Sequence, residues 1–208
     1  IRSLFSHLAG SDESVHDEFT LGQIHLFERM TERIQARFDY KIWRHILNSA
    51  GIERFPQYHF DMVRLGIGLH GISAAHANLQ PVSSFKTYIS SIRDVPEGQS
   101  IGYGRRSYTT RPSRIAVIPV GYADGLNRHL SNRIGEVYVK DQRVPIIGNI
   151  CMDTCMIDVT DTNATIGDEV EIFGKHIPVT ELSDKLGTIP YEILTGISFR
   201  VKRIYYKE

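Results

Sequence analysis

The two cysteines are the first candidates for chemistry, because cysteine can bind metals or form disulfides. Cys151 and Cys155 lie four residues apart, and no pair of cysteines or histidines elsewhere completes a tetrahedral zinc site. We therefore interpret both as small buried hydrophobic residues and predict no metal site. The sequence also lacks a G-x-S-x-G nucleophile turn, a phosphate-binding Walker loop and a dinucleotide-binding fingerprint. Two cysteines make no disulfide framework, which favours a reducing, cytoplasmic setting.

The elements that would position a site differ between the two parts of the chain. Residues 1–80 follow the order strand, loop, helix, strand, which is typical of a parallel α/β layout. A short apolar strand ends at His7, and Thr20 is the predicted N-cap of a helix. The apolar residues of this helix are spaced by three and four: Leu21, Ile24, Phe27, Met30, Ile34 and Phe38.

Two further segments of this first part are less distinct. Residues 42–47 could form either a strand or a helix. Residues 62–69 make another apolar run, which Gly66 and Gly68 interrupt. Gln80-Pro81 marks the predicted boundary with the second part.

Residues 81–208 are rich in predicted strands that are separated by turn residues. Their close spacing favours an antiparallel barrel or sandwich. One helix interrupts them, with Thr180 as its predicted N-cap and Gly187 just past its end. The predicted strands are Ile115–Val120, Glu136–Val139, Val144–Ile147, Met156–Val159, Val170–Phe173 and Phe199–Tyr206.

The composition excludes several classes of protein. Lys plus Arg and Asp plus Glu both number 24 in 208 residues, so no basic bias suggests a nucleic-acid partner. No apolar run approaches the roughly 20 residues that span a membrane. The first residues do not resemble a signal peptide, because no small-residue cleavage site follows an apolar stretch. The 41% hydrophobic content suits one large globular domain or two small ones.

Eight short segments carry a further signal: Ser6-His7-Leu8-Ala9, Asn48-Ser49-Ala50, Met62-Val63-Arg64-Leu65-Gly66-Ile67, Gly102-Tyr103-Gly104, Gly121-Tyr122-Ala123-Asp124-Gly125, Cys151-Met152-Asp153, Gly167-Asp168-Glu169-Val170 and Thr188-Ile189-Pro190-Tyr191-Glu192. In the same order and at similar spacing, these segments resemble the alanine racemase family. Each segment is a weak signal alone, but eight in order make a specific match.

This resemblance implies a fold and a cofactor. The family joins an N-terminal (β/α)8 barrel to a C-terminal β domain and works as a head-to-tail homodimer with pyridoxal 5'-phosphate (PLP). By that likeness, residues 1–80 are the last strands of the PLP-binding barrel and residues 81–208 are the antiparallel, barrel-like β domain. The family's Schiff-base lysine lies at the end of the first barrel strand, and no lysine here has the matching neighbours. The polypeptide is therefore expected to be inactive by itself.

The resemblance also assigns residues to the cofactor. Ser49 and Tyr191, with Asn48 and the backbone of Gly66 and Ile67, match the family's cup for the PLP phosphate. Phosphate accepts hydrogen bonds from hydroxyl and backbone N–H groups, and glycine lets the backbone approach it closely.

Arg64 matches the arginine that the family places against the pyridine nitrogen of PLP. An arginine stays protonated and gives no proton to that nitrogen, so the ring remains neutral and is a weaker electron sink. His7 and His45 match two histidines that continue this network, which by resemblance runs Tyr103, His7, Arg64, His45.

Racemisation needs an acid-base group on each face of the Cα atom. In the family the lysine serves one face, and a tyrosine from the partner subunit, matched by Tyr103, serves the other. Met152 matches a residue whose backbone N–H contacts the substrate carboxylate, and Tyr122 lines the substrate corridor. The corridor also includes residues that match Asp12, Arg128 and Ile189. Asn149 departs from the pattern, since well-known members carry arginine there.

The leading interpretation is the C-terminal part of an alanine racemase, an isomerase that makes D-alanine for cell-wall peptidoglycan. One alternative is a racemase of the same fold that acts on serine or on a basic amino acid, because small differences in the corridor would decide the substrate. Another is a β-rich module that only mediates dimerisation, and it would need neither Arg64 nor Tyr103 nor Tyr191.

Overall fold

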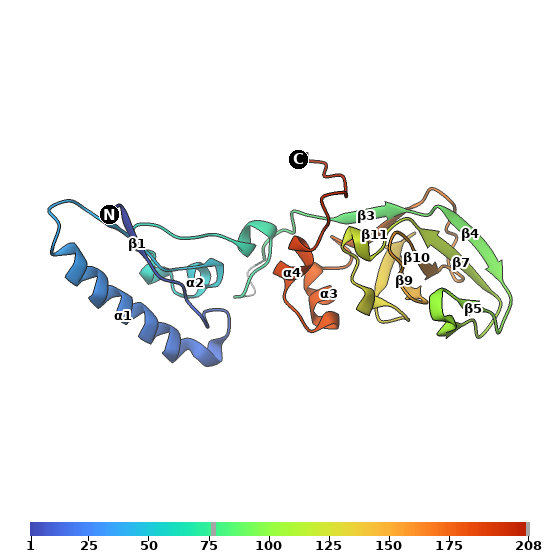
Figure 1. Ribbon diagram of the computed structural model, residues 1–208, viewed down its shortest axis with the longest axis horizontal. Helices are drawn as coiled ribbons and strands as arrows, with labels where there is room; N and C mark the ends of the chain where they lie inside the picture. The colour runs from blue at the N-terminus through green and yellow to red at the C-terminus, as the bar shows by residue number, and fades with distance from the viewer. Residues whose placement is uncertain (76–77, 207–208) are drawn as a thin grey trace. The chain divides into compact units, whose positions relative to one another are not determined.

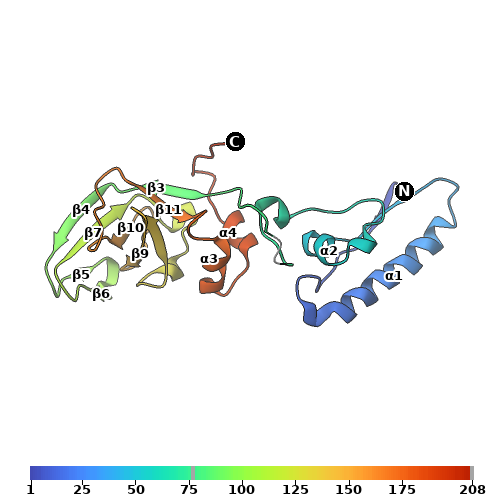
Figure 2. The same cartoon turned by 180° about the vertical axis from the view of Figure 1, so that it is seen from behind.

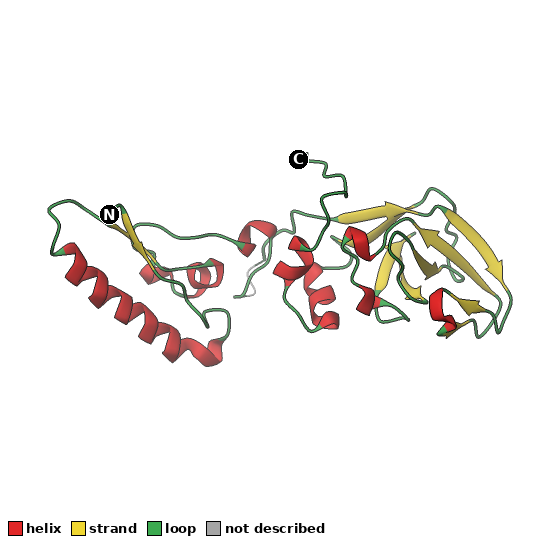
Figure 3. Ribbon diagram, viewed as in Figure 1, coloured by secondary structure: helices red, strands yellow, loops and turns green. Residues whose placement is uncertain are grey.

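The computed structural model describes residues 1–75 and 78–206. The chain divides into two compact units, Ile1–Val82 and Ser83–Glu208. Figure 1 follows the elements of each unit along the chain, from blue to red. The second unit contains most of the strands (Figure 3). Among the described residues, no helix is both long and apolar enough to cross a membrane.

Two short parallel strands and a long helix form the framework of the first unit. Strand β1 (Ser3–Phe5) pairs in parallel with β2 (Trp43–His45), and helix α1 (Asp17–Gln35) lies in the connection between them. A parallel pair needs such a crossover. Residues 42–47 therefore contain a strand, and the predicted α/β layout is confirmed.

Helix α1 begins earlier than predicted. It starts at Asp17, so the prediction of Thr20 as N-cap is wrong, and Thr20 is buried inside the helix. Acidic residues in the first turn, including Asp17, favour a helix N-terminus through the helix dipole. Ile24 and Phe27 are buried in the core, whereas Met30 is exposed, so only part of the predicted apolar stripe faces the core.

Beyond β2, the regular elements of the first unit are short helical turns. Helix α2 (Ser49–Arg54) follows β2 directly, then come the 3₁₀ turns η2 (Pro56–Tyr58) and η3 (Ile67–His70). The loops after β1 and after β2 thus begin at the same end of a parallel pair. In α/β folds that end is where polar side chains gather into sites. The buried core of the unit comprises Leu8, Ile24, Phe27, Ile46, Leu47 and Phe55.

The second unit is built on one seven-stranded antiparallel sheet, which curls around its core (Figure 2). The strand order is β3-β11-β8-β9-β10-β7-β4, so β3 and β4 form the edges. The strands are β3 (Phe85–Tyr88), β4 (Ser91–Val95), β7 (Ser113–Ile118), β8 (Glu136–Val139), β9 (Gln142–Ile147), β10 (Cys155–Asp158) and β11 (Glu169–Phe173).

Smaller elements complete this unit. A short hairpin joins β5 (Ser100–Ile101) to β6 (Ser107–Tyr108) through the 3₁₀ turn η4 (Tyr103–Arg105). Two further 3₁₀ turns are η5 (Tyr122–Asp124) and η6 (Arg128–Leu130). Near the C-terminus lie helices α3 (Val179–Leu186) and α4 (Pro190–Thr195).

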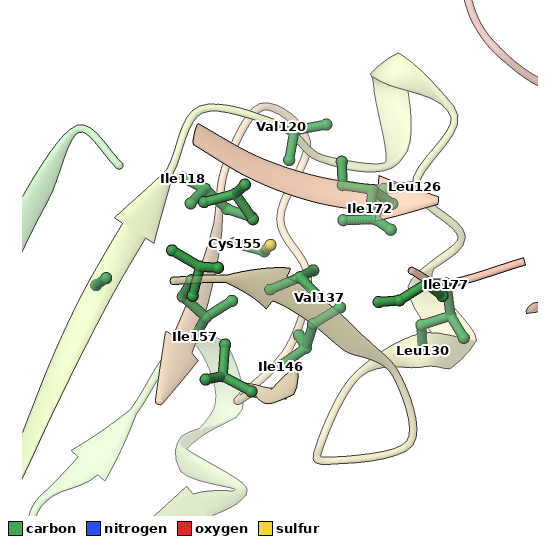
Figure 4. Close-up of a cluster of buried hydrophobic side chains, with 14 of the residues drawn as sticks. Ile118, Val120, Leu126, Leu130, Val137, Ile146, Cys155, Ile157, Ile172 and Ile177 are labelled. Carbon is green, nitrogen blue, oxygen red and sulfur yellow. The ribbon is translucent and has the colours of Figure 1, made fainter. Parts of the chain in front are cut away.

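The core of the second unit is aliphatic. Ile118, Ile146 and Ile157 from three neighbouring strands are almost fully buried, and Ile172 of β11 packs in the same cluster (Figure 4). Side chains of a strand alternate between its two faces, so each strand sends every second residue inward. Cys155 also belongs to this cluster.

Two predictions for the second unit are wrong. Residues 199–206 form no strand in the structure, and the Phe199 side chain is 98% exposed. Aromatic residues favour strands only where a neighbouring strand or a core receives them. Helix α3 begins at Val179 after Pro178, so Thr180 is not its N-cap. Gly187 does end that helix, in the left-handed conformation at φ 63°.

Candidate functional site

A hollow of about 550 Å³ on the second unit brings together three predicted site residues: Tyr103, Tyr122 and Met152. Asn149 and Arg128, which the sequence placed in the substrate corridor, line the same hollow. These residues come from η4, η5, η6 and the loop before β10. Residues from four separate segments therefore converge on one surface depression.

Tyr103 stands at the tip of the β5–β6 hairpin, and its side chain is 76% exposed. Gly102 (φ 74°) and Gly104 (φ 76°) flank it in backbone conformations that side-chain-bearing residues rarely adopt. The hairpin tip lies against Asn149, whose side-chain amide donates a hydrogen bond of 2.7 Å to the backbone carbonyl of Tyr103.

Tyr122 and Met152 are linked by a close approach of two backbones. The N–H of Tyr122 donates to the carbonyl of Cys151, and the N–H of Ala123 donates to the carbonyl of Met152, both at 3.0 Å. A Cβ at Gly121 would lie only 2.3–2.5 Å from backbone atoms of Cys151 and Met152. Only glycine fits at this position, and it allows the segments that carry Tyr122 and Met152 to meet.

Arg64 occupies the strand ends of the first unit. Its Nη2 atom donates to the backbone carbonyls of Ser6 (2.6 Å) and Ile46 (2.8 Å), which follow β1 and β2. Its Nε atom is buried and has no hydrogen-bond partner within the described part of the chain. A buried N–H without an acceptor is costly, so the atom is suited to an acceptor supplied from elsewhere.

His45 lies beside this arginine at the end of β2. The side chain is 8% exposed, stacks on Phe5 at 5.5 Å, and its Nδ1 atom is buried without a partner among the described residues. Burial, together with the nearby Arg64 cation, lowers the pKa of His45. His7 is exposed. Arg64 and His45 therefore form a compact pair, whereas Tyr103 belongs to the other unit.

The Ser49 side chain is held by the backbone of two glycines, Gly66 and Gly68. Its buried hydroxyl oxygen accepts the backbone N–H groups of Gly66 (2.8 Å) and Gly68 (3.2 Å). A hydroxyl that accepts two bonds still has its own proton to donate. A Cβ at Gly68 would lie 2.9 Å from the Leu65 side chain. The Oδ1 atom of Asn48 caps α2 by accepting from Gly51 N–H and also accepts from the Ser11 hydroxyl at 2.8 Å.

Of the other predicted residues, three are exposed and Ile67 is half-buried. Tyr191, at the start of α4, is 46% exposed, and Ile189 just before it is 59% exposed. Asp12 is exposed in the loop between β1 and α1, and Ile67 begins η3. Tyr191 lies in the second unit and Ser49 in the first, so neither unit by itself contains all the residues that the resemblance assigns to the phosphate.

Sequence reasoning missed two polar residues that support Tyr103 through Asn149: Asn132 and Ser107. Asn132 donates to the Asn149 side-chain oxygen (3.1 Å) and accepts from the Ser107 hydroxyl (2.7 Å). A weak signal existed, because asparagine tolerates the left-handed backbone conformation that Asn132 adopts at φ 56°. The partners themselves are distant in sequence, so no local pattern reveals them.

The cysteines form no site. Cys155 is fully buried, and this burial raises its pKa to about 12, so its thiol is unreactive at neutral pH. Cys151 is half-buried and donates weakly to the Asn149 carbonyl at 3.6 Å. Over residues 1–75 and 78–206, no group of three or more histidine, cysteine, aspartate or glutamate side chains could hold a metal ion.

The first unit is expected to lose stability as the pH falls, because of His45. The unfolded chain binds a proton near the ordinary pKa of 6.5, whereas the folded chain binds it only at lower pH. The contribution is therefore fully present above 6.5, begins to fall near that value, and is lost as the pH drops further through the lower pKa of the folded chain. Urea unfolding followed by fluorescence of Trp43, the only tryptophan, reports on this unit.

The comparison should be made between about pH 7.5 and pH 5.5. The loss of stability should be smaller in His45→Gln than in the native chain. The matched substitution of the exposed His70 by glutamine should leave the native loss unchanged. An equal loss in the native chain and in His45→Gln would contradict the assignment.

Two family models match the chain. The model described as alanine racemase, N-terminal domain, matches residues 1–74, and the model described as alanine racemase, C-terminal domain, matches residues 82–205. Among curated relatives, "Alanine racemase 2" of Caldanaerobacter subterraneus subsp. tengcongensis is 45% identical over 215 residues. The match covers 99% of this chain and 55% of the relative. The alanine racemase of Methanococcus maripaludis is 40% identical, with 57% of that relative covered.

Solved structures give the same family. An alanine racemase from Streptomyces coelicolor A3(2) matches with a TM-score of 0.92 at 32% identity, over 100% of this chain and 57% of that one. An alanine racemase from Bartonella henselae with covalently bound pyridoxal phosphate matches with a TM-score of 0.88 at 36% identity, over 99% and 57%. The chain thus spans little more than half the length of these relatives.

Proposed function

This chain belongs to the alanine racemase family, and we propose on that basis that it supplies part of the active site of a PLP-dependent alanine racemase. The observation that carries the proposal is the hollow around which Tyr103, Tyr122 and Met152 gather. The reaction would be the interconversion of L- and D-alanine. In keeping with this role, we propose a cytoplasmic enzyme that provides D-alanine for peptidoglycan.

The residues of the first unit fit PLP in two ways. The Ser49 hydroxyl, held by two backbone N–H groups, keeps a proton for an acceptor such as phosphate. The buried Nε of Arg64 has no acceptor from the described residues and could donate to an uncharged ring nitrogen. We propose that Ser49, with Asn48 and the backbone of Gly66 and Ile67, holds the phosphate.

Tyr191 of the second unit would complete the phosphate site, since its exposed hydroxyl can donate to an anion. When bound, PLP would supply an electron sink that makes the Cα–H bond of the amino acid acidic. Arg64 would keep the ring neutral, because guanidinium remains protonated and two carbonyls fix it in place. A neutral His45 would support the charged Arg64. The lowered pKa of His45 favours this neutral imidazole.

Tyr103 is proposed as the acid-base group on one face of the amino acid. Its hydroxyl would take or return the Cα proton, while a lysine from a complete N-terminal domain would serve the opposite face. A neutral tyrosine hydroxyl is a weak base, so the completed site would have to place a cationic group near it. Its 76% exposure supports the proposal that the residue reaches a site completed by a partner subunit in a homodimer.

The experiment that tests this function compares two samples with PLP and L-alanine. The present polypeptide alone should form no D-alanine above the background of free PLP, because none of its lysines has the neighbours of the family's PLP lysine. Joined to the N-terminal segment of the Caldanaerobacter relative that includes that lysine, it should racemise alanine.

L-Serine provides the specificity control for the joined protein, and alanine is expected to be the better substrate. Enzyme-like turnover by the polypeptide alone would contradict the assignment of the lysine. A folded, PLP-loaded joined protein that racemises serine but not alanine would contradict the choice of substrate.

A further inference from the structure

The hairpin tip that carries Tyr103 is attached to the second unit by a chain of hydrogen bonds between uncharged side chains. Gly148 N–H donates to the Ser107 hydroxyl (3.2 Å), and Ser107 donates to the Asn132 side-chain oxygen (2.7 Å). Asn132 then donates to the Asn149 oxygen (3.1 Å), and Asn149 donates to the Tyr103 carbonyl (2.7 Å). Every bond in this chain runs in the same direction.

The direction fixes the orientation of both amides. If the Asn149 amide were turned over, its NH₂ group would face the NH₂ group of Asn132 and its oxygen would face the Tyr103 carbonyl. Both contacts would be repulsive. Asn149 is only 7% exposed, so water does not readily replace either bond. Aligned bonds of this kind also polarise one another.

The backbone near Tyr103 needs such an attachment. Gly102 and Gly104 allow a wide range of backbone conformations on both sides of the tyrosine, which would leave its direction poorly fixed. The Asn149 amide nitrogen lies close to both the carbonyl of Tyr103 and Gly104, where an added Cβ would approach it to 3.6 Å. Ser107 lies on strand β6, so the tip of the hairpin and this strand are tied to the same two asparagines.

We propose that Asn149, held by Asn132 and Ser107, is a positioning residue that fixes the Tyr103 backbone and thereby aims its hydroxyl. The effect on catalysis rests on the proposed acid-base role of Tyr103. The effect on the hairpin does not depend on that role, and it can be measured in the 208-residue polypeptide alone.

The first test is backbone amide exchange in Asn149→Asp. Aspartate keeps an oxygen that accepts from Asn132 but puts a carboxylate oxygen in place of the NH₂ donor, so the bond to the Tyr103 carbonyl is replaced by a repulsive contact. Exchange across residues 100–108 should rise about tenfold, while the core strand β11 keeps its protection. The matched control is Asn163→Asp, which makes the same change at an exposed asparagine and should leave residues 100–108 unchanged.

Ser107→Ala provides a second variant. It removes the two hydrogen bonds of the Ser107 hydroxyl, to Gly148 and to Asn132, with a smaller change in structure. It should also raise exchange across residues 100–108, and it decides the matter if Asn149→Asp fails to fold. Native protection of residues 100–108 in a folded variant would overturn the proposal.

The second test is a double-mutant cycle in the joined racemase described above. Asn149→Asp should lower kcat for L-alanine about 10–100-fold, with KM changed less than about threefold, because a misaimed acid-base group slows proton transfer. Added to Tyr103→Phe, it should slow the enzyme no further than about twofold, since Asn149 acts through the tyrosine hydroxyl. Additive losses would overturn the positioning role. Inactivity of the joined protein with its native residues would instead contradict the proposed function.

Discussion

Replacing Tyr103 by phenylalanine in the joined racemase is expected to lower racemisation about 10²–10⁴-fold in both directions, the usual cost of losing a positioned general acid-base group. Both directions suffer because each needs one group to remove the proton and the other to return it. The substitution keeps the ring and removes only the hydroxyl, so the fold should survive. The measurement is the initial rate of L- to D-alanine conversion and of its reverse.

The matched control for this variant is Tyr108→Phe. Tyr108 lies on strand β6 of the same hairpin and is 49% exposed, so it loses the same hydroxyl a short distance from the tip. It should retain the native rate within about twofold. Equal losses in the two variants would mean that the hairpin, rather than the Tyr103 hydroxyl, is what the reaction requires.

Replacing Arg64 by leucine is expected to destabilise the first unit by about 3 kcal/mol. The change removes two hydrogen bonds from a charged donor, worth about 1.5–3 kcal/mol each, and leaves the carbonyls of Ser6 and Ile46 without it. These two carbonyls directly follow the paired strands β1 and β2. Without the Arg64 donor the ends of both strands are held less firmly, which destabilises the unit. Urea unfolding of the chain, followed by Trp43 fluorescence, measures the change.

Two further variants calibrate that result. Arg64→Lys keeps the positive charge and one donor group, so it should lose less stability than Arg64→Leu. Arg37→Leu removes an exposed arginine of the same unit and should change stability by no more than about 0.5 kcal/mol. A native urea midpoint in Arg64→Leu would show that the arginine contributes little to holding the strand ends.

Turn residues on either side made several strands predictable from sequence. Strand β8 has the predicted bounds, Glu136–Val139, and buries every second residue. Helices α2 and α4 were not predicted, because each has only six residues and short helices depend on tertiary packing rather than on local propensity. The strand predicted at 199–206 does not form, although its residues favour strands, because no neighbouring strand in the described part of the chain pairs with it.

The candidate site shows a similar division. Resemblance identified Tyr103, Tyr122 and Met152 from separate segments, and the structure places all three around one hollow. It could not identify the support of Tyr103, because Asn132 lies 17 residues from Asn149 and 25 from Ser107 along the chain. Contacts of that separation depend on how the strands and turns fold together, which no local sequence pattern records.

The central claim is that Tyr103 serves one face of the amino acid only, and hydrogen exchange at Cα in deuterated water tests it most directly. By resemblance to the family, the lysine would take the Cα proton of D-alanine and Tyr103 that of L-alanine. With Tyr103→Phe in the joined racemase, D-alanine should therefore still exchange its Cα hydrogen through the lysine, whereas L-alanine should exchange slowly. The native joined protein should exchange both. If L-alanine exchanges as fast as D-alanine in the Tyr103→Phe protein, Tyr103 is not the second base, and Tyr122 in the same hollow becomes the candidate.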